Sequence, residues 1–86
     1  MKKHEFTVTI IGRKNCVWCR KARQLCKANE IEYQYKDLNA PANAQLRHWF
    51  EVENIQTVPQ IFILENGSSE LVGGYQDFAR LLSSRS

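Results

Sequence analysis

Two cysteines three positions apart are the clearest candidates for chemistry in this chain of 86 residues. Cys16 and Cys19 enclose Val17 and Trp18, and the third cysteine of the chain is Cys26. Residues i and i+3 of a helix lie roughly 5–6 Å apart, so this pair can form a disulfide and reopen with little backbone movement. An odd number of cysteines argues against a secreted disulfide framework, and we therefore expect a reactive dithiol in a reducing, cytoplasmic compartment.

The surroundings of the pair predict which sulfur is the nucleophile. Cys16 lies where a helix is expected to begin, with unpaired amide N–H groups and the positive end of the helix dipole at its sulfur. Arg13 and Lys14 add positive charge just before it. Both effects favour the thiolate, so we expect Cys16 to have a lowered pKa and to attack, and Cys19 to be the resolving thiol.

These residues also fit other roles. Two cysteines at this spacing also make half of a zinc site, but His4 and His48 stand alone and far apart, so no metal is expected. Cys26 falls on an apolar helical stripe and is predicted to be a buried, unreactive thiol. Trp18 lies between the two cysteines, in what we take as a short loop, where it would face solvent or substrate, or else fold back over the domain.

The elements that position these residues follow from hydrophobic periodicity. Strands are predicted at 6–11, 32–37, 60–64 and around 71–72, and helices at 17–29, 42–53 and 75–83. This β-α-β-α-β-β-α order predicts an α/β fold with a four-stranded mixed sheet flanked by three helices. A helical crossover makes the first two strands parallel, and Asn66-Gly67 makes the last two a hairpin. The order of the strands across the sheet does not follow from the sequence.

Composition limits the class of protein. Hydrophobic residues make up 43% of the chain and charged residues 24%, which suits one small domain over residues 1–86 with its core at about 6–82 and a frayed tail at 83–86. The longest apolar runs have three or four residues, so neither a membrane span nor a secretory signal is expected.

Charge is unevenly distributed along the chain. Residues 1–27 hold eight Lys or Arg against one Glu, and the remainder holds four against eight acids. Such a basic segment can bind phosphate, an anionic small molecule or an acidic protein partner, or it can be a solvated helix face. No groove-reading element accompanies it, so we do not expect nucleic acid binding.

Three segments together resemble the small dithiol glutaredoxins of bacteria and phages. They are Gly12-Arg-Lys-Asn-Cys-Val-Trp-Cys19, Thr57-Val-Pro-Gln-Ile-Phe62 and Gly73-Gly-Tyr-Gln-Asp77. The similarity runs from about Phe6 to Leu82. It implies a thioredoxin-like fold with a cis peptide bond before Pro59, a rare feature that places the Val58 backbone beside the cysteine pair.

The resemblance also implies a glutathione site. In this reading the Val58 backbone pairs with the extended tripeptide, Gly73 and Gly74 leave room for it, and Gln76 and Asp77 meet its γ-glutamyl end. Arg13 meets the other carboxylate or acidifies Cys16. The glutathione-binding residues implied are Arg13, Trp18, Thr57, Val58, Pro59, Gly74, Tyr75, Gln76 and Asp77.

The activity implied is that of a glutathione-dependent thiol–disulfide oxidoreductase, a monomer acting on disulfide-containing or glutathionylated proteins, with ribonucleotide reductase as a plausible recipient. One alternative is a donor of the same fold recharged by thioredoxin reductase, although the Trp-Ser-Gly-Phe-Arg-Pro segment usual in such donors is missing. Another is a carrier of a glutathione-ligated [2Fe–2S] cluster, because Val17 replaces the proline of the family's commonest Cys-Pro-Tyr-Cys pair.

Overall fold

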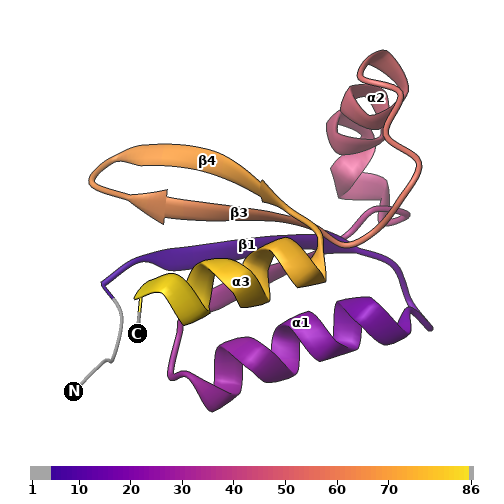
Figure 1. Ribbon diagram of the computed structural model, residues 1–86. Helices are drawn as coiled ribbons and strands as arrows, with labels where there is room; N and C mark the ends of the chain where they lie inside the picture. Colours follow the sequence, from indigo (N-terminus) through magenta and orange to yellow (C-terminus); the bar gives the residue numbers. More distant parts are fainter. Residues whose placement is uncertain (1–4, 86) are drawn as a thin grey trace.

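The computed structural model describes residues 5–85 and confirms the predicted order of elements (Figure 1). The elements are β1 (Thr7–Gly12), α1 (Val17–Ala28), β2 (Tyr33–Asp37), the short 3₁₀ helix η1 (Pro41–Asn43), α2 (Ala44–Val52), β3 (Gln60–Glu65), β4 (Ser68–Gly73) and α3 (Tyr75–Arg85). No helix in this described range is long and apolar enough to cross a bilayer.

The four strands form one mixed sheet in the order β2-β1-β3-β4. As predicted, β1 and β2 are parallel, and β3 and β4 form an antiparallel hairpin. Strands β1 and β3, whose pairing the sequence did not predict, are antiparallel neighbours with Ile10 opposite Ile61. This pairing puts the carboxyl end of β1, which leads to the cysteines, beside the start of β3, which follows Pro59.

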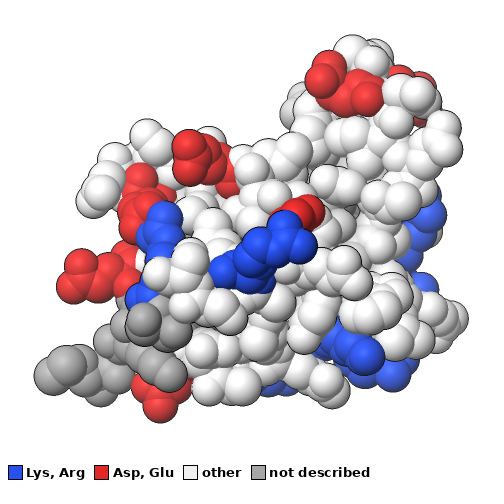
Figure 2. All heavy atoms as spheres, in the orientation of Figure 1, with Lys and Arg blue, Asp and Glu red and all other residues white. Residues whose placement is uncertain are grey.

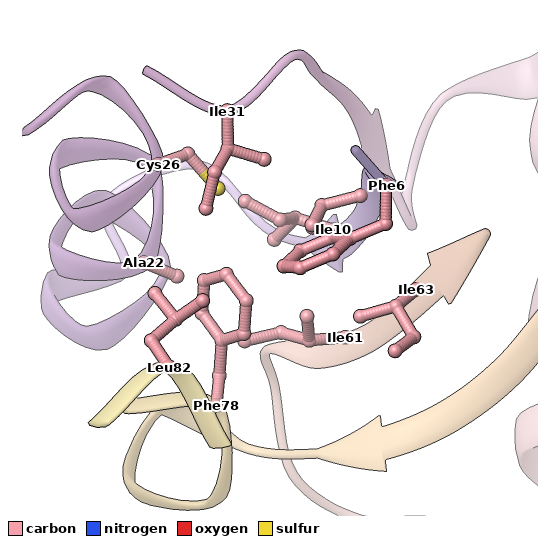
Figure 3. Packing of buried hydrophobic residues seen from close by; sticks show 10 residues of the cluster. Phe6, Ile10, Ala22, Cys26, Ile31, Ile61, Ile63, Phe78 and Leu82 are labelled. Atoms are coloured by element: carbon pink, nitrogen blue, oxygen red, sulfur yellow. The ribbon is translucent and has the colours of Figure 1, made fainter. Parts of the chain in front are cut away.

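Helices α1 and α3 cover one face of the sheet and bury its main core (Figures 1 and 3). Alternate residues of the strands point into this layer, as period-two patterning requires. Ala22 and Cys26 of α1 and Phe78 and Leu82 of α3 meet them from the helical side. The buried members of this core are Phe6, Val8, Ile10, Ala22, Cys26, Ile31, Ile61, Ile63, Phe78 and Leu82.

The opposite face of the sheet carries a smaller core under α2. Ile11, Leu38 and Phe50 are buried there, and Trp49 is half-buried with its ring centroid 5.4 Å from that of Phe50 and 5.6 Å from that of Phe62. Val58 packs against the same cluster. This core therefore holds the loop that carries Val58 to the end of the sheet.

The C-terminal part of the chain is more ordered than predicted. Helix α3 extends through Arg85, so the residues at 83–85 are helical rather than a frayed tail, and Ser86 lies outside the described residues. Arg85 binds Glu65 at the end of β3 through two hydrogen bonds, with Nη1 at 2.8 Å from Oε2 and Nη2 at 3.3 Å from Oε1. This long-range pair ties the last helical turn to the sheet, and sequence periodicity contains no sign of it.

Cys26 is fully buried between α1 and the sheet, as predicted. Burial raises the pKa of its thiol to about 12, since an apolar environment disfavours the thiolate. In the unfolded chain, this thiol ionises near its ordinary pKa. The unfolded state therefore loses a proton at a pH where the folded state keeps it.

We expect this difference to weaken the folded state at alkaline pH. The stability that Cys26 contributes is fully present below about pH 8 and declines as pH rises toward 12, by between about 1 and 2 kcal/mol from pH 8 to pH 10. Denaturant titration of the disulfide-bonded protein at both pH values measures it, with Cys26→Ala as the control. An equal pH dependence in the two proteins would contradict the assignment.

Candidate active site

The predicted cysteine pair forms a disulfide at the start of α1, with a Cα–Cα separation of 5.2 Å. Cys16 is the N-cap residue of the helix, and its Sγ accepts a hydrogen bond from the Cys19 amide at 3.2 Å. The two sulfurs differ in access, because Cys16 is half-buried whereas Cys19 is 0% exposed. Of these two sulfurs, solvent can reach that of Cys16.

The end of β1 holds this helix start in place. A Cβ on Gly12 would collide with the Tyr35 hydroxyl and lie 2.7 Å from Cys19 Sγ, so only glycine lets the strand lie against the buried sulfur. The Tyr35 hydroxyl donates to the Arg13 carbonyl at 2.8 Å. Burial raises the pKa of Tyr35, while the nearby Arg23 guanidinium acts in the opposite direction. Tyr35 therefore stays protonated and anchors the loop before Cys16.

Eight of the eleven predicted site residues line one open groove of about 520 Å³. They are Trp18, Thr57, Val58, Pro59, Gly74, Tyr75, Gln76 and Asp77. Three separate parts of the chain supply them: the first turn of α1, the loop before β3, and the start of α3. The cis peptide bond expected before Pro59 is present in that loop.

Trp18 differs in setting from the prediction. It belongs to the first turn of α1, not to a loop, because the helix starts directly after Cys16. Its ring lies 5.4 Å from that of Tyr75, and the Lys21 Nζ lies 4.6 Å from its centroid. The side chain keeps 47% of its surface exposed. It thus packs onto the domain and still presents an aromatic wall to the groove.

The two glycines before α3 have different roles. Gly73 has φ +121°, and a Cβ there would collide with the Asp77 carboxylate. That carboxylate accepts a hydrogen bond from the Gly74 amide at 3.3 Å, so Asp77 caps the helix start from within its first turn. Gly73 therefore leaves room for Asp77, and it is not among the groove-lining residues. Gly74 does line the groove, and a Cβ there would meet only the Pro59 carbonyl, at 3.9 Å.

Arg13, also predicted to bind the groove's ligand, is not among the groove-lining residues. It lies with Cys16 in a second cavity of about 380 Å³, which we call the basic pocket. The lining of the basic pocket is Arg13, Lys14, Asn15, Cys16, Arg20, Arg23 and Tyr35. Sequence reasoning identified the basic segment but not this grouping around one cysteine, which the spacing of Arg20 and Arg23 along the helix could have suggested.

No cluster of three or more His, Cys, Asp or Glu side chains able to hold a metal occurs within residues 5–85. His48 is exposed on α2, and His4 lies outside the described residues.

The glycines provide a matched pair of variants. Gly73→Ala should lower the free energy of unfolding by about 1–3 kcal/mol, because alanine is strained at positive φ and meets the Asp77 carboxylate. Gly74→Ala should cost less than about 1 kcal/mol, since its surroundings are open. Urea titration of both variants measures the difference. Equal losses would mean that Asp77 does not require the glycine at 73.

Comparison with known proteins agrees with this arrangement. The family model described as glutaredoxin matches residues 8–68. Glutaredoxin 1 from Francisella tularensis superposes with a TM-score of 0.70 and 24% identity, over 94% of this chain and 96% of that one. The dithiolic glutaredoxin 2-C-Grx1 from Trypanosoma brucei brucei gives 0.71 and 26%, over 92% and 79%.

The glutaredoxin-like protein NrdH-redoxin from Escherichia coli shares the fold with a TM-score of 0.62 and 14% identity, over 87% of this chain and 93% of that one. A comparison with curated protein sequences found no match. The family model covers most of the chain, including the cysteine pair and the loop before β3. The protein therefore belongs to the glutaredoxin family.

Proposed function

We propose that this glutaredoxin is a glutathione-dependent thiol–disulfide oxidoreductase whose nucleophile is Cys16. The observation that carries the proposal is the position of Cys16: its half-buried sulfur caps α1, and the next residues of the same helix lead into the groove. A sulfur that can be approached beside a groove suited to a short peptide is what exchange with a tripeptide disulfide requires.

Electrostatics favour an ionised Cys16 in the reduced protein. The hydrogen bond from the Cys19 amide points at its sulfur, and the first turn of α1 contains no acidic residue. Arg13 and Lys14 line the same cavity as Cys16. Amide hydrogen bonds, the helix dipole and nearby cations all stabilise a thiolate over a thiol.

The reaction is a sequence of thiol–disulfide exchanges. The Cys16 thiolate attacks one sulfur of a protein disulfide, and the other sulfur leaves as a thiolate. The Cys19 thiolate then attacks Cys16, which releases the second substrate thiol and leaves the Cys16–Cys19 disulfide seen in the structure. Two glutathione molecules reduce that disulfide and leave as oxidised glutathione. For a glutathionylated protein, Cys16 attacks the glutathione sulfur, and a second glutathione regenerates it.

The groove offers complementary chemistry for glutathione. The Val58 backbone can pair with an extended peptide, and the first turn of α3 has amide N–H groups without intrahelical partners for a carboxylate. The exposed Asp77 carboxylate suits the γ-glutamyl ammonium, beside Gln76. We place the protein in the cytoplasm, where glutathione is abundant and reduced, with ribonucleotide reductase among its candidate recipients.

Serine variants test the separate roles proposed for the sulfurs of Cys16 and Cys19. Cys16→Ser should reduce activity to the rate measured without protein, because the nucleophile is lost. Cys19→Ser should lose the reduction of protein disulfides but keep part of the deglutathionylation activity, which needs only Cys16. Both activities are measured with glutathione and glutathione reductase as the recycling system. Full activity of Cys16→Ser would exclude the scheme, and faster recycling by thioredoxin reductase would exclude glutathione as the main reductant.

The pKa of Cys16 can be measured in the reduced Cys19→Ser protein. We expect a pKa below the value of about 8.5 of a free cysteine, within the range of about 3.5–7.5 found for cysteines at helix N-termini. The pH dependence of the alkylation rate reports it, after the slower reaction of Cys26 is subtracted with a Cys16→Ser/Cys19→Ser control. A pKa of an ordinary free thiol would remove the electrostatic basis of the mechanism.

A further inference from the structure

The basic pocket is a concentration of positive charge on one side of the reactive sulfur. Four of its lining residues are cationic: Arg13, Lys14, Arg20 and Arg23. Figure 2 shows basic side chains gathered near the start of α1, whereas acidic side chains lie over α2 and around the β3–β4 hairpin. The lining of the pocket contains no acidic residue.

In the described part of the chain, none of these four cations forms an ion pair with a carboxylate. Within residues 5–85, the ion pairs found are Arg80 with Asp77 and Arg85 with Glu65, and none involves the four cations of the pocket. Arg23 stacks on the Tyr35 ring at 4.5 Å, a contact with a neutral partner that keeps the net positive charge of the pocket. Like charges around one cavity repel each other, and an anionic occupant would relieve that repulsion.

The basic pocket and the groove share no lining residue. Cys16 lines the basic pocket, and Trp18, two residues further along α1, lines the groove. A glutathionylated protein carries two chains on its disulfide, glutathione and the protein. If glutathione lies in the groove, the protein chain must leave the sulfur in another direction, and the basic pocket is adjacent.

We propose that the basic pocket docks an acidic segment next to the reactive cysteine of the protein substrate. This inference rests on the proposed function and assigns the substrate class: cysteines flanked by Asp or Glu. Charges near a binding site mainly accelerate productive encounter and select partners. The pocket therefore acts on substrate choice, and the sulfur chemistry stays with the cysteine pair.

Two glutathionylated peptides provide the test. They have the same length and cysteine position, and one carries Asp and Glu beside the cysteine where the other carries Asn and Gln. The readout is the ratio of kcat/KM for the acidic peptide to that for the amide peptide. Because Cys16 reacts with both peptides, a change in its own reactivity cancels in this ratio.

Arg20→Glu and Lys27→Glu form a matched pair of variants. Both residues are exposed positions of α1, and both substitutions change the charge equally. Seven residues separate them, about two helical turns, so they lie on the same helical face with Lys27 farther from Cys16. Arg20 lines the basic pocket and Lys27 does not.

We expect the unmodified protein to prefer the acidic peptide by about three- to tenfold at low salt, mostly through KM. Arg20→Glu should reduce the ratio to about one or below, and Lys27→Glu should leave it nearly unchanged. High salt should abolish the preference, because exposed charges are screened.

Equal turnover of the two peptides by the unmodified protein would overturn the docking proposal while leaving the proposed function intact. An equal effect of Arg20→Glu and Lys27→Glu would also overturn it, since the preference would then reflect net charge. The docking proposal would also be overturned if an oligonucleotide competed with the acidic peptide more strongly than a glutamate peptide of the same charge. Failure of the proposed function looks different, because neither peptide would be turned over.

Discussion

The junction between β1 and α1 is the constraint on which the site depends. Strand β1 ends at Gly12, pressed against the buried Cys19 sulfur, and α1 begins only a short loop later with Cys16 as its N-cap. The hydrogen bond from Tyr35 to the Arg13 carbonyl holds that loop to β2. A helix start fixed in this way keeps the Cys19 amide directed at the Cys16 sulfur, and preorganised donors stabilise developing negative charge without having to rearrange.

The three sulfurs of α1 show how burial divides reactivity within a single helix. Cys16 is half-buried and faces the solvent, Cys19 is buried but bonded to it, and Cys26 lies in the main core. Cys19 and Cys26 are seven residues apart, so they share the inner face of the helix. Helical geometry thus separates a partly exposed sulfur, a buried sulfur bonded to it, and a thiol inside the core.

Two surfaces flank the reactive sulfur and differ in chemistry. The groove combines aromatic side chains, a loop backbone and a helix start, whereas the basic pocket is lined mainly by long cationic side chains. The contact between Trp18 and Tyr75 joins α1 to α3 and closes one wall of the groove. In the proposed function, these two surfaces would receive the two halves of a disulfide substrate.

Local signals in the sequence were enough to predict the order of elements, the hairpin at Asn66-Gly67 and the helix start at Cys16, because turn residues, caps and hydrophobic periodicity act over a few neighbours. The strand order, the separation of Arg13 from the groove and the room that Gly73 leaves for Asp77 became known from the folded chain. The ion pair that extends α3 to Arg85 joins residues 20 positions apart. These features depend on how distant segments meet in space, and no local pattern encodes that meeting.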